Sequence, residues 1–335
     1  MTILFIDSCA AYSDSGAFAD KWDYTSDPYW VGHGDSVDLR SGAYGIISDN
    51  TTYRALIYKN IIETYTLYVG FAYKKTSDID TTPVQFNYDS DSQVKIIFLA
   101  SGAIEISVGS TLLATSISGL VTAISGWKYI EVGATIHASS GSVDVKINGS
   151  SVVSASGVDT QAISGGINRV QFNGVGHFTD IYFDDASFHA PAGKGMRIDM
   201  LSPNAIGTYS QMTPSTGSTN FLCVDDGRTS DNTDTDYVTA DAVDEIDTYN
   251  VESVDSIGTD IDAVAINIVA RQDDVGTVTY KPMIRVNSSD YLGSDVTTTT
   301  SYLDEQYIWE LNPDDSAAWE ETDINNAEFG MKRTA

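Results

Sequence analysis

Three carboxylates, Glu245, Asp247 and Glu252, are the residues of this chain that could most directly perform acid–base chemistry. A retaining glycoside hydrolase needs two carboxyl groups about 5 Å apart, flanking the bond that is cleaved. Positions 245 and 252 differ by seven, and an odd separation directs two side chains to opposite faces of a strand. We therefore expect no catalytic pair at these positions.

The histidines and cysteines show no spacing typical of a metal centre or an activated nucleophile. The sequence also lacks the glycine-rich phosphate loop and the serine elbow of hydrolases. Two cysteines are too few for a disulfide framework, and we expect both to be buried free thiols. These absences favour a protein that is not an enzyme. The residues concerned are His33, His137, His177, His189, Cys9 and Cys223.

Clusters of aspartates are the candidate metal ligands, because Ca²⁺ takes six to eight oxygen ligands in proteins. One cluster follows a predicted strand and the other lies in a polar stretch without the glycine or distal glutamate of an EF-hand loop. Two interpretations stand, a calcium site and a solvated turn, and no other cofactor is expected. The candidate ligands are Asp184, Asp185, Asp231, Asp234 and Asp236.

An aromatic cluster near the start of the chain is the candidate contact surface. Aromatic ring faces stack on the C–H groups of a pyranose, and the carboxylates interleaved with these rings accept sugar hydroxyls. Large rings also pack in cores and at protein interfaces, so a glycan platform, a partner contact and a core cluster are all open. The cluster consists of Trp22, Tyr24, Tyr29 and Trp30.

The charge of the chain excludes one class of partner. The 335 residues contain 47 Asp and Glu against 18 Lys and Arg, which gives a net charge of −29 at pH 7. A field of this sign repels phosphate backbones, so nucleic acid is not an expected partner. No apolar run approaches the roughly 20 residues that span a bilayer, and we expect no membrane insertion.

The elements that must position these residues are strands. Residues 129–136 and 142–148 alternate apolar and polar side chains, so each strand should have one buried and one wet face. Asn148 and Gly149 tolerate the positive φ of a type I′ turn, which should reverse the chain into Val152 and Val153. A sheet with one buried face must pack against a second layer.

Further strands are predicted on both sides of this hairpin, and no repeat of 20–50 residues is present. We place a domain boundary between residues 191 and 192, in a stretch of small residues and proline. Residues 261–270 and 278–286 should form a second hairpin, and a short helix fits within 314–326. The other predicted strands are 65–73, 94–99, 104–108, 168–172 and 178–183.

With these features the chain resembles a group of two-domain bacteriophage virion proteins whose first half is a concanavalin A-like (laminin G-like) sandwich. The resemblance implies an all-β fold, with a concanavalin A-like jelly-roll sandwich at residues 1–191 followed by a second β-sandwich domain at 192–335. It also implies a virion location and no defined enzymatic activity. The matching stretches are 3–7 with Tyr12, 21–22, 68–73, 126–132, 142–149, 157–161, 180–185, 197–199, 201–204, 211–217, 234–238, 318–319 and 326–330.

Two functions follow as expectations. The first is a non-enzymatic structural protein of the virion surface, in a tail, a fibre or a capsid decoration, that contacts other virion proteins and forms a homo-oligomer. The alternative is a carbohydrate-binding adhesion module that recognises a host surface glycan. A glycan depolymerase is disfavoured, because the sequence offers no carboxylate pair of suitable spacing.

Overall fold

The protein is an all-β chain in the computed structural model, which describes residues 2–9, 21–25, 46–48, 55–217, 219–225, 234–254, 260–273 and 275–335. The chain divides into two compact units, Met1–Ile198 and Asp199–Ala335. This division falls seven residues after the predicted boundary. Residues 191–198 contact the N-terminal unit, as described below, and therefore belong to it.

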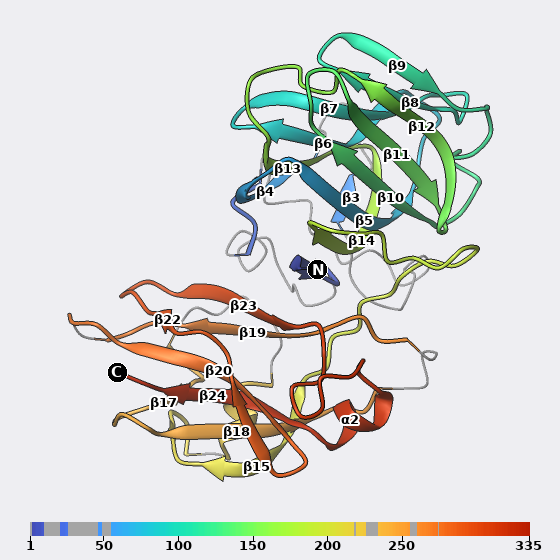
Figure 1. The fold of residues 1–335 in the computed structure, drawn as a ribbon. Helices are drawn as coiled ribbons and strands as arrows, with labels where there is room; N and C mark the ends of the chain where they lie inside the picture. Colours follow the sequence, from blue (N-terminus) through green and yellow to red (C-terminus); the bar gives the residue numbers. More distant parts are fainter. Residues whose placement is uncertain are drawn as a thin grey trace. The chain divides into compact units, whose positions relative to one another are not determined.

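The N-terminal unit is a jelly-roll β-sandwich of two antiparallel sheets (Figure 1). Among the described residues, the first sheet has the order β1-β14-β5-β10-β11-β12, with β3 also paired to β14. The second sheet has the order β2-β4-β13-β6-β7-β8-β9. Because β1 pairs with β14, the beginning and the end of the unit lie in neighbouring strands.

The seven strands predicted by residue range in this unit, β5, β7, β8, β10, β11, β13 and β14, agree with those ranges to within three residues at each end. The bounds are β1 Ile3–Asp7, β2 Tyr24–Thr25, β3 Ile46–Ser48, β4 Ala55–Thr64, β5 Thr66–Lys74, β6 Thr81–Tyr88, β7 Asp91–Phe98, β8 Ile104–Val108, β9 Thr111–Thr115, β10 Lys128–Thr135, β11 Gly141–Ile147, β12 Ser150–Val158, β13 Ile167–Gly174 and β14 Gly176–Asp184.

Aromatic rings fill the space between the two sheets. Phe71 and Phe183 from the first sheet meet Phe172 from the second, with ring centroids 5.3 and 6.3 Å from that of Phe172. All three side chains are buried, and aliphatic side chains from both sheets surround them. Edge-to-face and offset ring pairs of this kind stabilise a core beyond the area they bury.

The predicted hairpin is present. Val143 and Val145 of β11 are buried in the core, whereas Asp144 and Lys146 lie on the other side of the strand. Asn148 and Gly149 have φ values of 48° and 72°, and β12 begins directly after them. The alternating pattern therefore sets the buried face of this hairpin, and the turn residues set its register next to the turn, where Ile147 pairs with Ser150.

Among the described residues, the C-terminal unit packs a six-stranded sheet, β15-β18-β24-β20-β21 with β22 also paired to β20, against a two-stranded ribbon of β19 and β23 (Figure 1). β16 and β17 form a second two-stranded pair. Ile284 from the sheet, Trp309 from the ribbon and Ile324 from the short helix belong to one buried cluster. The bounds are β15 Pro203–Ser210, β16 Thr213–Pro214, β17 Val238–Thr239, β18 Ile246–Val251, β19 Val264–Ala270, β20 Thr279–Val286, β21 Ser289–Leu292, β22 Val296–Thr297, β23 Leu303–Trp309, α2 Glu321–Asn326 and β24 Glu328–Arg333.

One strand pairing in this unit was predicted wrongly. β19 and β20, the strands expected to form a hairpin, do not pair with each other. β19 pairs with β23 along its whole length, while β20 lies between β21 and β24 in the six-stranded sheet. Both strands carry apolar residues, and their alternation alone does not distinguish a hairpin from two strands in different layers.

The helices found in the described part of the chain are short. None of them has the length and apolar character needed to cross a membrane.

Candidate functional site

The candidate site is the outer face of the first sheet, the side of β5, β10, β11, β12 and β14 directed away from the sandwich core. Register places Tyr68 of β5 opposite Gly133 of β10, and Gly133 opposite Asp144 of β11. Residues directly opposed in antiparallel strands project from the same face. Because Asp144 is on the side opposite the buried valines of β11, this row lies on the outer face.

Hydroxyl groups border this row. Thr66, Thr135 and Ser142 oppose one another across β5, β10 and β11, and the Thr66 and Thr135 Oγ1 atoms are 3.3 Å apart. On the neighbouring β12, the Ser151 hydroxyl donates to Asp144 Oδ1 at 2.5 Å. The outer face of these four strands is therefore rich in donors and acceptors of the kind that bind a polyhydroxylated ligand.

The chain returns over this face after β14. Within this return segment (residues 186–198), the Phe188 ring stands above Gly133, where a Cβ atom would lie 2.6 Å from Phe188 Cζ. The ring makes an edge contact with Tyr68 at a centroid distance of 4.8 Å. Lys146 Nζ lies 3.8 Å from the centroid of Phe188, a cation–π contact. All three side chains are partly exposed.

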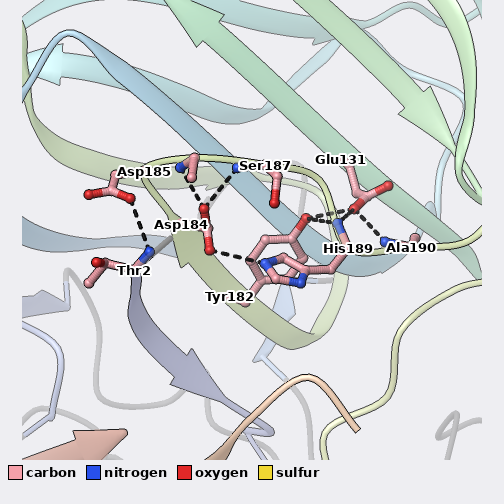
Figure 2. Close-up of polar contacts among 9 residues, drawn as sticks. Thr2, Glu131, Tyr182, Asp184, Asp185, Ser187, His189 and Ala190 are labelled. Carbon is pink, nitrogen blue, oxygen red and sulfur yellow. Dashed lines mark hydrogen bonds and ion pairs between the residues drawn. The ribbon is translucent and has the colours of Figure 1, made fainter. Parts of the chain in front are cut away.

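A buried carboxylate fixes the beginning of the return segment. Asp184, the last residue of β14, accepts backbone hydrogen bonds at Oδ1 from Ala186 at 2.6 Å and Ser187 at 2.9 Å (Figure 2). Its Oδ2 lies 3.0 Å from His189 Nε2. Both oxygens of the carboxylate are therefore used to hold residues of the same short loop.

A second buried carboxylate holds the next residues. Oε1 of Glu131, in the middle of β10, accepts hydrogen bonds from the Tyr182 hydroxyl at 2.6 Å and from the backbone N–H groups of His189 and Ala190, both at 2.9 Å (Figure 2). Glu131 Oε2 is buried and has no hydrogen-bond partner in the described part of the chain. One oxygen thus receives all three donors.

The pKa values of these groups match their roles. Burial alone would raise the pKa of Asp184, but hydrogen bonds from His189, Ala186 and Ser187 outweigh it and hold the pKa below its ordinary value. Burial, followed by the proximity of Tyr129 and Glu131, raises the pKa of Tyr182 well above its ordinary value. At neutral pH Asp184 is an anionic acceptor and Tyr182 a protonated donor.

The later part of the return segment also lies against the first unit. The Gly193 N–H donates to Asn148 O at 2.7 Å, and the Ile198 N–H donates to Asp180 Oδ1 at 3.1 Å. A Cβ atom on Gly149 would lie 2.2 Å from Pro191 O, so this close approach requires glycine. These contacts explain why the N-terminal unit extends to Ile198.

Trp22, one residue of the predicted aromatic platform, is buried in the core and is not at this site. Trp22 is 1% exposed and donates from Nε1 to Asp7 Oδ2 at 2.8 Å. Its ring packs edge-on to Phe5 in the core, so it offers no surface to a sugar or a partner, and its prediction as a contact residue is corrected. Tyr24 lies in β2, while Tyr29 and Trp30 fall outside the described residues.

The predicted calcium ligands are separated between the two units. Asp184 holds the return segment, and Asp185 Oδ1 accepts the Thr2 N–H at 3.2 Å (Figure 2). Oδ1 of Asp234 accepts hydrogen bonds from Arg271 Nε at 2.9 Å and the Tyr302 hydroxyl at 2.5 Å. A guanidinium thus occupies the place of a cation at Asp234.

Of the remaining two aspartates, only Asp236 lies among the described residues. Asp236 lies in an exposed turn, and Asp231 falls outside the described residues. Across the described ranges, no group of three or more His, Cys, Asp or Glu side chains is arranged to hold a metal ion.

Asp247 and Glu245, two of the carboxylates considered for acid–base chemistry, have structural roles. Asp247 is wholly buried and accepts four hydrogen bonds. Glu245 Oε2 accepts the backbone N–H groups of Asp241 and Ala242 at 2.6 and 3.0 Å. The donors to Asp247 are Gln211 N at 2.7 Å, Met212 N at 2.8 Å, Asn220 Nδ2 at 2.5 Å and the Tyr249 hydroxyl at 2.9 Å.

Comparison with known proteins gives no family. The sequence matches no protein-family model and no curated protein. Among solved structures, a sialidase is similar over 55% of this chain, at 11% identity and a TM-score of 0.42. The match spans 19% of the sialidase.

Two further structures are similar at the same level. A protein of unknown function with a galectin-like fold from Bacillus subtilis has 10% identity and a TM-score of 0.32, over 42% of this chain and 81% of that one. The carbohydrate recognition domain of Emp46p has 9% identity and a TM-score of 0.36, over 56% of this chain and 97% of that one. These likenesses are too distant to assign a family or a function.

Proposed function

We propose that the protein is a non-enzymatic carbohydrate-binding protein and that the outer face of the N-terminal sandwich binds the glycan. The observation that supports this is the position of two partly exposed rings, Tyr68 and Phe188, beside rows of hydroxyls on β5, β10, β11 and β12. Rings pack against the apolar side of a sugar, and Ser, Thr, Lys146 and Asp144 can bond its hydroxyls.

The carboxylates of this face support binding without cleavage. Glycoside hydrolysis by the usual routes needs two carboxyl groups that reach the same bond. Glu131 and Asp184 are wholly buried and hold backbone N–H groups, and the partly exposed Asp144 accepts the Ser151 hydroxyl. We therefore assign Asp144 to bonding a sugar hydroxyl rather than to catalysis.

An array of bacterial surface polysaccharides and their oligosaccharides tests this proposal, with isothermal titration of the strongest binder. We expect binding that persists in EDTA, releases no reducing ends and weakens in Tyr68→Ala and Phe188→Ala. Tyr237→Ala is the matched control, because Tyr237 is a partly exposed tyrosine of the C-terminal unit. No array signal for the wild-type protein would refute the proposal.

The proposed setting is the surface of a virus particle, where the glycan would belong to the host. This part rests on the sequence resemblance alone, as does the proposal that the chain forms a homo-oligomer among other virion proteins. Immunogold labelling of particles tests the location, and light scattering of the purified chain tests the oligomer.

A further inference from the structure

We propose that Glu131 and Asp184 are positioning residues for glycan binding, which seat Phe188 on the outer face and so make the return segment part of the binding surface. This inference rests on the proposed function. Phe188 belongs to no strand, and it reaches the sheet only because the chain turns back after β14. The sheet therefore lacks this ring until the return segment docks.

The two carboxylates hold the backbone on both sides of Phe188. Asp184 accepts the N–H groups of residues 186 and 187, and Glu131 accepts those of residues 189 and 190 (Figure 2). Four of the five backbone N–H groups of residues 186–190 thus donate hydrogen bonds to two side chains of the sheet. Residue 188 is the one in the middle, and its ring is directed to Gly133.

The seat itself is shaped for a ring. Gly133 has no side chain, and a Cβ atom there would lie 2.6 Å from Phe188 Cζ and 2.7 Å from Tyr68 Cδ1. Lys146 of β11 contacts the other side of this position, with its Nζ atom 3.8 Å from the centroid of the Phe188 ring. Lys146 is directly opposite Glu131 in the register, yet no ion pair joins the two side chains.

Glu131 accepts its hydrogen bonds at one oxygen, so Glu131→Gln is a conservative variant that keeps an acceptor. Its Oε1 accepts all three donors, while Oε2 accepts none within the described residues. A glutamine at this position keeps a carbonyl oxygen for the same donors, whereas alanine removes it. Glu131→Gln should therefore retain the seat of Phe188, and Glu131→Ala should lose it.

The first measurement needs no sugar. Amide hydrogen exchange of the full chain should show protection at residues 186–190 reduced by about tenfold or more in Glu131→Ala and Asp184→Ala. Protection should be largely restored in Glu131→Gln and unchanged in Glu105→Gln, a partly exposed glutamate of β8. Unchanged protection in the alanine variants, or an equal loss in β13, would overturn the proposal.

The second measurement is a double-mutant cycle on binding of a fluorescein-labelled tetrasaccharide from the polysaccharide with the strongest array signal. Phe188→Ala should weaken binding by about tenfold. Glu131→Ala should weaken it similarly in the wild-type background but less than about twofold in the Phe188→Ala background. An undiminished effect of Glu131→Ala in that background would show that the carboxylate does not act through Phe188.

The two experiments separate the two claims. If the wild-type protein binds no polysaccharide on the array, the proposed function fails, and the exchange data still decide whether Glu131 and Asp184 seat Phe188. If the protein binds but the cycle shows independent effects, the proposed function stands and the positioning role is refuted.

Discussion

Replacing Tyr182 with phenylalanine should destabilise the N-terminal unit more than the same replacement at Tyr129. Both tyrosines are buried on the outer face, in one cluster, and both would keep their rings. The Tyr182 hydroxyl donates to a buried carboxylate oxygen, Glu131 Oε1, at 2.6 Å. The Tyr129 hydroxyl donates to a neutral carbonyl, Asp180 O, at 3.2 Å.

The expected loss of stability in each variant follows from the charge of the hydrogen-bond acceptor. A hydrogen bond to a charged group contributes about 1.5–3 kcal/mol to stability, and one between neutral groups about 0.5–1.5 kcal/mol. For a domain of 150–250 residues, each kcal/mol shifts the unfolding temperature by about 2–4 °C. With about 2 kcal/mol for the charged acceptor and about 1 kcal/mol for the neutral one, Tyr182→Phe should lower the unfolding temperature of this unit by roughly 4–8 °C, and Tyr129→Phe by roughly 2–4 °C.

Differential scanning calorimetry of the full chain measures this, with the two variants compared at the same pH and salt. Glu105→Gln serves as a surface control and should change the transition little. If Tyr182→Phe is no more destabilising than Tyr129→Phe, the Tyr182 hydroxyl does not donate a charge-assisted hydrogen bond to Glu131, and the reasoning from the charge of the acceptor is wrong.

Three further predictions concern acid sensitivity and packing. The pKa of Asp184 is lowered in the folded state, so ionised Asp184 stabilises the fold. This contribution to the free energy of unfolding is complete at neutral pH and is lost as the pH falls through the lowered pKa. Asp184→Asn should thus lower the unfolding temperature at pH 7 and flatten part of its fall between pH 5 and 3 in calorimetry. Gly70→Ala should cost about 1–3 kcal/mol in urea unfolding, since its Cβ would lie 2.1 Å from Tyr182 Cε1. Asp247→Ala should destabilise the C-terminal unit by roughly 3–5 kcal/mol, because four donors lose their acceptor, and its calorimetric transition should move while that of the N-terminal unit does not.

Local pattern predicted the strands of the N-terminal sandwich well. Alternation in residues 142–148 specifies one buried face, and the Asn148-Gly149 turn pairs Ile147 with Ser150, as observed; the two later shifts of register between β11 and β12 were not predicted. Pairing partners in the C-terminal unit were harder to predict. β19 and β20 are adjacent in sequence and both carry apolar residues, and only the packing of the folded core decides that β19 pairs with β23.

The candidate site itself was missed because it depends on contacts distant in sequence. Glu131 lies at a polar position of β10, which predicts a wet face, but residues 189 and 190 cover it completely. Phe188 is a lone ring before a stretch of small residues, a position typical of a linker. The glycine at 133, within an otherwise strong strand, was the one local sign that another part of the chain comes close.

The pairing of β1 with β14 has a consequence for biosynthesis. Ile3 lies opposite Asp184 and Asp7 opposite Ile181. β1 is therefore synthesised long before β14, the strand with which it pairs. At a translation rate of about 5–20 residues per second, roughly 10–35 s pass between their emergence from the ribosome. During that interval the nascent chain displays an apolar strand without its neighbour, which is a natural binding target for a chaperone.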